Sequence, residues 1–404
     1  MRKTHLFIGL TILLWGISLA NGQEILGIAS CDPCKPTACE PCEPLCDPCD
    51  PCDGKSGLFL PFTFGGWVET GIYGNGHDNR GRYGNGSVFS ASHARTDIQM
   101  NQLYLFGEKE MNTRRGFDWG GRIDLAYGTD YDVMQTFDGE FDAGWGVNKS
   151  GYGMAAYQLY GTLGYKDLSV KIGKFAGCVG WEAVPSKDNF FYSHSFCYMI
   201  EPATHTGVLA TYDLSDRLSL NAGWTTGADS SFKNPYGNSA VLTGFTYALS
   251  DNANIHYWIN AGKQHDFAFE LGSDYFVQSL CLEWALTERF DYVLQYNLRN
   301  DNIDNGSRLS AYGINNHFLY KLTDNLSTGM RVEWHRNKGG DGFYYLSQSG
   351  DYWNVTLGLR WDVTDHLSFR PEIRYDWCRD GAVPFNNGTS RDQVSGGGGM
   401  IVSF

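Results

Sequence analysis

The sequence predicts an all-β fold: a transmembrane antiparallel up-and-down β-barrel of about sixteen strands, with short periplasmic turns and long external loops. Three observations predict it. From residue 62 onward, segments of about 10 to 14 residues carry apolar side chains at alternate positions, which is the period of a β-strand. Short turns and long loops alternate between these segments. After the N-terminus, no apolar run reaches the roughly 18 residues that a membrane-spanning helix needs, so any membrane crossing must use strands.

The composition limits the classes of protein. The 404 residues include 24 Phe, 12 Trp and 24 Tyr, which excludes an intrinsically disordered chain. The formal net charge of -14 offers no basic surface to a phosphate backbone, so we expect no nucleic-acid partner.

The N-terminus has the features of a signal peptide. Arg2 and Lys3 precede a mostly apolar, uncharged run at 6–20, and small residues follow up to Gly22. A lipidation motif ending at Cys31 is the alternative, but it lies far from the apolar run. We therefore assign the first 22 residues to a signal peptide and expect the mature protein to leave the cytoplasm.

A Cys- and Pro-rich arm is predicted at 23–57. Seven of the eleven cysteines and six of the twelve prolines fall in 31–52, with almost no apolar side chain to bury. Such a segment cannot fold on a core, and exported thiols tend to oxidise. We expect a periplasmic, disulfide-forming spacer that links the protein to wall or neighbouring proteins; zinc binding is the weaker alternative.

The barrel is predicted at 58–404. In its clearest strand, 367–378, apolar residues such as Phe369 and Ile373 alternate with charged residues such as Arg370 and Glu372. The same criterion gives sixteen strands, at 62–74, 99–111, 117–128, 155–166, 168–177, 205–213, 217–227, 238–249, 252–264, 274–286, 289–300, 308–321, 325–338, 351–362, 366–379 and 392–404.

Five of the short turns repeat a pattern in which Ser or Thr precedes an acidic residue. Their acids recur at intervals of 35 to 41 residues, at Asp216, Asp251, Glu288, Asp324 and Asp365. We interpret the repeat as a hairpin unit and the acids as turn formers. With both chain ends on the side of the short turns, this is the threading of an outer-membrane barrel, and the terminal Phe404 suits its insertion. A soluble β-sandwich or propeller explains the alternation but not the one-sided loop lengths.

Sixteen strands enclose an interior too wide for strand side chains to fill, so an aqueous channel is expected. The inward-facing charged residues predicted to line it are Arg122, Asp124, Arg299, Arg331, Glu333, Arg360, Arg370, Glu372 and Arg374. The arginines either face acids of a loop and screen solutes by charge, or pair with wall acids and stiffen the barrel. The sequence leaves both readings open.

The third long loop, 178–204, is expected to fold into the channel as a constriction. Its candidate residues are aromatic, acidic or imidazole side chains: Trp181, Glu182, Asp188, Phe190, Phe191, Tyr192, His194 and Glu201. Cys178 and Cys197 are disulfide candidates that would staple the loop. The alternative is an exterior loop packed on the rim by its aromatic rings.

Nothing in the sequence predicts catalysis. Ser193 and His194 place a hydroxyl beside an imidazole, but adjacent residues rarely form a nucleophile and base without an orienting acid. We expect no enzyme activity, no catalytic residue, no cofactor and no metal site.

Three motifs carry a family resemblance. The stretches QLYLFGEK at 102–109, RRGFDWGGR at 114–122 and NFFYSH at 189–194 resemble the OmpL-like outer-membrane β-barrel porins of planctomycete-type bacteria. The resemblance runs from about residue 60 to 404. It implies a porin-like barrel and leaves the substrate open, and the Cys-rich arm lies outside it.

Two functions remain in view. The first is an outer-membrane porin, a passive channel for small hydrophilic solutes or ions, embedded in outer-membrane lipid and assembled as a homo-oligomer, a trimer by analogy with many sixteen-stranded porins. The second is a structural anchor with a plugged lumen, cross-linked to the wall or to neighbouring barrels through the Cys-rich arm. The sequence leaves the choice to measurement.

Overall fold

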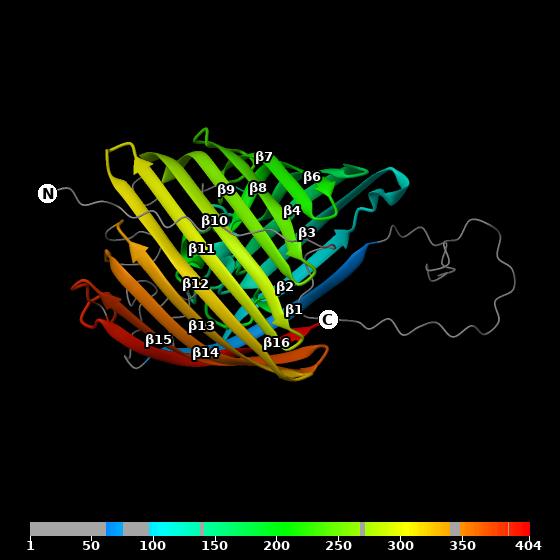
Figure 1. Ribbon diagram of the computed structural model, residues 1–404. Coiled ribbons are helices and arrows are strands. Elements are labelled where there is room, and N and C mark those ends of the chain that lie inside the picture. Colours follow the sequence, from blue (N-terminus) through cyan, green and yellow to red (C-terminus); the bar gives the residue numbers. More distant parts are fainter. Residues whose placement is uncertain (1–61, 76–96, 138–140, 267–270, 340–347, 387) are drawn as a thin grey trace, which may run out of the picture.

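The computed structural model describes residues 62–75, 97–137, 141–266, 271–339, 348–386 and 388–404 (Figure 1). The signal peptide and the Cys-rich arm therefore lie outside the described residues, and their assignments stay predictions.

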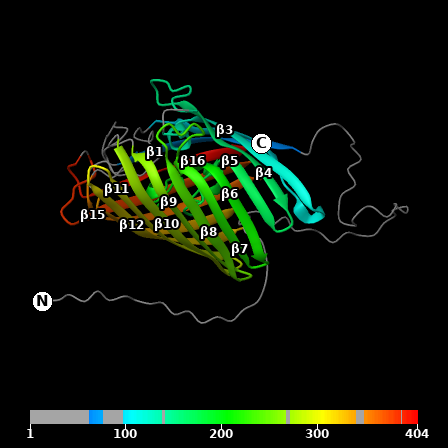
Figure 2. The ribbon, with the colours of Figure 1, turned by 90° about the horizontal axis from the view of Figure 1, so that it is seen from above.

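In the described chain, sixteen strands form one closed barrel, which confirms the predicted fold class (Figures 1 and 2). Every strand pairs in antiparallel fashion with its neighbours in the sequence, and β1 pairs with β16. The strands are β1 Thr63–Asn75, β2 Gln99–Lys109, β3 Phe117–Gly128, β4 Gly153–Tyr165, β5 Leu168–Ala176, β6 Thr204–Ser215, β7 Leu218–Ala228, β8 Ser239–Ser250, β9 Ala253–Asp266, β10 Leu271–Thr287, β11 Phe290–Ile303, β12 Arg308–Thr323, β13 Leu326–Asn337, β14 Gly350–Thr364, β15 Leu367–Arg379 and β16 Asp392–Ser403.

The alternation of side chains separates a lipid face from an inner face. In β15, Ile373 is 56% exposed whereas the neighbouring Arg374 is completely buried. Apolar residues thus point outward and charged residues inward, and closure pairs the backbone of every strand, as lipid requires.

The repeated short turns carry a β-bulge at their hydroxyl residue. Between β6 and β7 the register shifts just before Ser215, and the backbone N–H of Arg217 donates to Ser215 Oγ at 3.3 Å. Thr287 and Arg289 repeat the same bond at 3.2 Å between β10 and β11. The hydroxyl therefore extends each hairpin into its turn, and several strands run one or two residues further than the sequence predicts.

The helical elements are short: α1 Tyr131–Met134 and the 3-10 turns η1 Thr113–Arg115, η2 Ser186–Asp188 and η3 Tyr198–Ile200. None of the helices found in the described ranges is long and apolar enough to cross a membrane. Two of these turns, η2 and η3, lie in the segment between β5 and β6, which we call loop 3 (residues 177–203).

Candidate functional site

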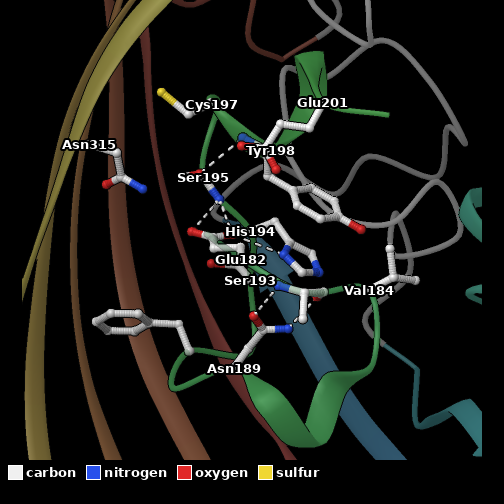
Figure 3. A network of polar contacts seen from close by, with 12 residues as sticks. Glu182, Val184, Asn189, Ser193, His194, Ser195, Cys197, Tyr198, Glu201 and Asn315 are labelled. Carbon is white, nitrogen blue, oxygen red and sulfur yellow. Dashed lines mark hydrogen bonds and ion pairs between the residues drawn. The ribbon is translucent and has the colours of Figure 1, made fainter. Parts of the chain in front are cut away.

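Loop 3 lies inside the barrel, bonded to inward-facing side chains of the wall. Figure 3 shows residues of the loop with hydrogen bonds among themselves, such as those from His194 and Ser195 to Glu182. A loop without regular structure leaves many backbone N–H and C=O groups without partners, and inside a barrel these need protein or water to bond. The wall provides partners of both kinds, arginines for the carbonyls and glutamates for the amides.

Three buried arginines hold the carbonyl groups. Arg370 Nη1 donates to the carbonyl oxygens of Ser186 at 2.6 Å and Asn189 at 2.8 Å. Arg374 Nη1 donates to the carbonyl oxygen of His194 at 2.6 Å. All three arginines, including Arg331 below, are at most 2% exposed, so loop 3 covers them completely.

Arg331 has the most contacts with the loop. Its Nη1 donates to the carbonyl oxygen of Ser193 at 2.6 Å and lies 3.2 Å from a carboxylate oxygen of Glu182. Its Nη2 donates to Ser193 Oγ at 3.0 Å. One side chain of β13 thus binds two separate parts of loop 3, at Glu182 and at Ser193.

Two wall glutamates hold the amide groups. The carboxylate of Glu333 accepts from the backbone N–H groups of Phe196 at 2.7 Å and Cys197 at 2.6 Å. The carboxylate of Glu372 accepts from the N–H of Tyr192 at 2.8 Å. Bases and acids alternate along the wall because successive inward positions of β13 and β15 carry opposite charges.

The two glutamates of loop 3 have opposite protonation tendencies. Burial by itself would raise the pKa of the Glu182 carboxyl, but Arg331 and His194 reverse that effect and hold the pKa below its ordinary value. Burial raises the pKa of Glu201 well above its ordinary value, although hydrogen bonds from Asn297 and Gln295 oppose the rise. The surroundings therefore favour the charged form of Glu182 and the protonated form of Glu201.

Inward-facing glycines of the wall make room for the aromatic residues of loop 3. A Cβ added to Gly71 would lie 2.5 Å from Tyr192, and one added to Gly329 would lie 2.5 Å from Phe190. A Cβ on Gly358 would lie 3.0 Å from Phe191. We call these three glycines the sockets; they show why the loop packs so close to the wall.

The predicted disulfide is wrong. Cys178 and Cys197 are both free thiols. Cys197 is held at the β13 wall through its backbone bond to Glu333, whereas Cys178 packs with Phe175 on the inner face of β5. The two thiols belong to opposite ends of loop 3, which is fastened by hydrogen bonds and ion pairs.

The remaining predicted wall residues lie on the inner face with other partners. Arg122 pairs with Glu108 and Asp124, each at 2.8 Å. Arg299 pairs with Asp301 at 2.9 Å and is completely buried.

Arg360 bridges wall and loop, because it pairs with Asp362 at 3.2 Å and donates to the carbonyl oxygens of Lys187 and Asn189, each at 3.3 Å. Asp188, beside Lys187, is an exposed residue of the loop. Trp181 of the loop faces the wall, and the centroid of its ring lies 4.4 Å from the centroid of the His317 ring on β12.

The sequence did not single out several residues that bind the loop. Glu69 pairs with Arg370, and Gln102 Oε1 accepts from the backbone N–H of Ser186 at 3.1 Å. Asn297 Nδ2 donates to a carboxyl oxygen of Glu201 at 2.5 Å. The alternation of side chains along each strand predicts that all of these wall residues face inward. Nothing in the sequence indicates which atom of loop 3 each of them binds.

Apolar clusters fill further parts of the interior. On the inner faces of β6, β8 and β10, Leu209, Leu242 and Val277 are buried together with Val179 of loop 3. A second cluster joins Phe196 of loop 3 to wall residues. Loop 3 thus packs against apolar side chains of β6, β8 and β10 and forms hydrogen bonds and ion pairs with charged side chains of β13 and β15.

Comparisons with known proteins agree with this architecture. The family model described as "Putative beta-barrel porin-2, OmpL-like" matches residues 61–404. No curated protein matches the chain. Among solved structures, the chain is similar to an anion-selective porin from Comamonas acidovorans, with 11% identity, a TM-score of 0.56, and coverage of 85% of this chain and 99% of that one.

Two further solved structures share the fold. The outer membrane channel DcaP of Acinetobacter baumannii has 11% identity and a TM-score of 0.56, with 85% of this chain and 97% of that chain covered. OmpT of Vibrio cholerae in its trimer form has 12% identity and a TM-score of 0.52, with 85% and 99% covered. The closed barrel and the family match over 61–404 lead to one conclusion: the chain belongs to the OmpL-like β-barrel porins and is an outer-membrane porin.

Proposed function

We propose that the protein is a passive channel for small hydrophilic solutes in which loop 3 sets the passable cross-section. The observation that carries the proposal is the fastening of loop 3 to β13, β14 and β15 through Arg331, Arg360 and Arg370. A loop bonded at so many points keeps one position, so the passage beside it has a constant width and admits solutes by size.

The buried arginines cannot screen solutes by charge, because loop 3 covers them. The charged groups left open at the loop are Lys187 and Asp188, which are exposed. Arg122 and Arg360 are electrostatic neighbours of Asp188 from β3 and β14. We propose that this group, rather than the predicted arginine row, sets the weak ion preference of the channel.

The second candidate function is a plugged anchor. The apolar cluster of Leu209, Leu242 and Val277 under loop 3 favours it, because such packing excludes water from part of the lumen. In this role the Cys-rich arm would supply the cross-links to wall or neighbouring proteins. The trimer form of Vibrio OmpT, which shares the fold, supports a homotrimer in either case.

Planar-bilayer recording decides between the two. The full mature protein should give stepwise openings and a reversal potential in a salt gradient. Lys187→Ala should shift the reversal potential toward cation preference and Asp188→Asn toward anion preference. Lys149→Ala, which removes an exposed lysine from the second long loop, should change neither. Silence from a protein shown to be folded and inserted would overturn the channel and leave the anchor.

A further inference from the structure

One cation of the wall differs from the arginines that bind loop 3: Lys171 on β5. Phe175 of the same strand is completely buried on the inner face and Ile172 is 48% exposed on the outer face, so alternation directs Lys171 inward. Lys171 is half-buried, whereas the three arginines that hold the carbonyl groups of loop 3 are at most 2% exposed. The open part of the Lys171 side chain therefore faces the lumen.

Two aromatic rings flank the ammonium group of Lys171. Its Nζ atom lies 4.6 Å from the centre of the Tyr160 ring on β4 and 5.5 Å from the centre of the Phe175 ring. Gly173 is the inward-facing residue between Lys171 and Phe175, and a Cβ added there would lie 2.7 Å from the Cα atom of Tyr160. The glycine therefore leaves the space between the ammonium group and the two rings free of another side chain.

Lys171 has no acidic partner. Across the described ranges, its ammonium group takes part in no hydrogen bond and no ion pair. Arg122 on the neighbouring inner face of β3 shows the opposite arrangement, because it pairs with Glu108 and Asp124, each at 2.8 Å. Ring faces attract a cation without using its N–H groups, so those of Lys171 stay available to an anion.

Hydroxyl and apolar groups lie on either side of this cation. Thr162 is directly opposite Lys171 in the register of β4 and β5, and Ser169 is the preceding inward-facing residue of β5. Leu209 is opposite Lys171 on β6, is 5% exposed, and belongs with Phe175 to a buried apolar cluster. We call this set the Lys171 subsite (Tyr160, Thr162, Ser169, Lys171, Phe175 and Leu209).

We infer that the Lys171 subsite binds small organic carboxylates that carry an apolar body, such as aromatic acids. The inference rests on the proposed channel function, because it names a class of solute for that lumen. The ammonium group supplies a charge-assisted hydrogen bond to the carboxylate, and the two hydroxyls can donate as well. The half-buried Tyr160 ring and the apolar cluster give the body of the acid a surface to contact. Inorganic anions use only the polar contacts, so the subsite favours the aromatic acid.

A titration of benzoate into the detergent-solubilised full protein, followed by saturation-transfer NMR, tests the inference and needs no open channel. Benzoate should bind more tightly than acetate, which lacks the ring, and than benzamide, which lacks the charge. Lys171→Ala should raise the dissociation constant of benzoate roughly tenfold, the usual effect of losing one hydrogen bond to a charged group. Lys171→Arg keeps the cation and should retain binding.

Two further variants separate the parts of the subsite. Tyr160→Leu removes a ring but no charge, so it should weaken the binding of benzoate more than that of acetate. The matched control is Lys263→Ala on β9, which removes an outward-facing cation that pairs with Asp274 at 3.9 Å. It should leave the affinity for benzoate unchanged.

Bilayer recording of the same protein distinguishes the failure of the subsite from the failure of the channel. Benzoate binding without openings would overturn the channel and keep the binding site. Openings without benzoate binding, or equal affinity in Lys171→Ala and the parent protein, would overturn the subsite and keep the channel. Equal affinity for benzamide and benzoate would also overturn the subsite. If Lys171→Ala fails to fold, judged by its heat-shifted electrophoretic mobility, Lys171→Gln keeps the side-chain stem and gives the same test.

Discussion

A single guanidinium, that of Arg331, joins the wall of the barrel to two separate parts of loop 3. Its partners are the Glu182 carboxylate and the Ser193 carbonyl and hydroxyl groups. Sequence alternation predicted that Arg331 faces inward, which is correct. Its use as a fastener for the loop, rather than as a charge for solutes, depends on loop geometry that no local pattern encodes.

Replacing Arg331 with Met should release the loop. The substitution keeps the side-chain volume but removes the arginine partner of the buried Glu182 carboxylate, which retains His194 at 2.9 Å, and it removes the Arg331 donor of the Ser193 carbonyl. We expect a loss of about 1 to 3 kcal/mol in unfolding free energy. We expect a lower thermal unfolding midpoint together with larger and noisier single-channel currents. Arg299→Met, which breaks a buried pair with Asp301, should destabilise the barrel without changing the currents. Unchanged currents in Arg331→Met would contradict the fastening role.

The buried Glu201 makes stability depend on pH. Burial raises the pKa of Glu201 in the folded protein well above its ordinary value of 4.5, so the folded state keeps this proton to a higher pH than the unfolded chain does. Stability from this group is complete below about pH 4.5 and is lost as pH rises toward the folded pKa.

Glu201→Gln should remove that dependence, because a glutamine oxygen accepts the bonds from Gln295 and Asn297 without carrying a proton. Thermal unfolding midpoints at about pH 5 and about pH 9 should differ less in the variant than in the parent protein. Glu288→Gln, in an exposed turn, serves as the control and should keep the parent difference. An undiminished difference in Glu201→Gln would rule out this carboxyl as its source.

Strands and loop 3 differ in how far the sequence predicts them. A period of two fixes which face each strand residue occupies, so all sixteen strands were predicted with small errors at their ends. β10, predicted at 274–286, spans Leu271–Thr287. Its end lies one residue later because the bulged hydroxyl extends the ladder, and its start lies three residues earlier because 271–273 pair with 264–266 of β9. The inward position of loop 3 was an expectation from loop length and its aromatic residues. The sockets were missed, since a glycine in a strand gives no signal of what fills the space.

Filling a socket should displace the loop. Gly329 has ordinary strand geometry, so Gly329→Val strains no backbone, but its Cβ would lie 2.5 Å from Phe190. Overpacking of this kind costs about 1 to 3 kcal/mol, and we expect faster proteolysis within 177–203. The matched control is Gly161→Val in β4, where a Cβ would lie 3.9 Å from the nearest backbone oxygen. Equal proteolysis of the two variants would argue against the sockets.

Closure of the barrel joins the two ends of the described chain. The N–H of Gly66 donates to the carbonyl oxygen of Phe404 at 3.0 Å. The N–H of Phe404 donates in return to the carbonyl oxygen of Gly66 at 2.9 Å. The β1–β16 register continues this pairing from Trp67 and Ser403 to Asn75 and Ser395. The C-terminal residue is thus a structural part of the seam.

Deleting Phe404 should impair assembly more than replacing it. The deletion removes two backbone hydrogen bonds, each worth about 1 kcal/mol, and also the terminal ring, whereas Phe404→Ala keeps the backbone bonds. The fraction of membrane-inserted protein with heat-shifted electrophoretic mobility should fall in the order parent, Phe404→Ala, deletion. Equal yields for deletion and parent would show that β1 and β16 close without this residue.

The anchors of loop 3 also set an order of events during assembly. The loop lies between β5 and β6, but its partners Arg331, Glu372 and Arg374 belong to β13 and β15. A growing chain therefore cannot settle the loop until its last strands exist. A chain truncated before β13 should expose 177–203 to protease, because the wall side chains that hold the loop are then missing.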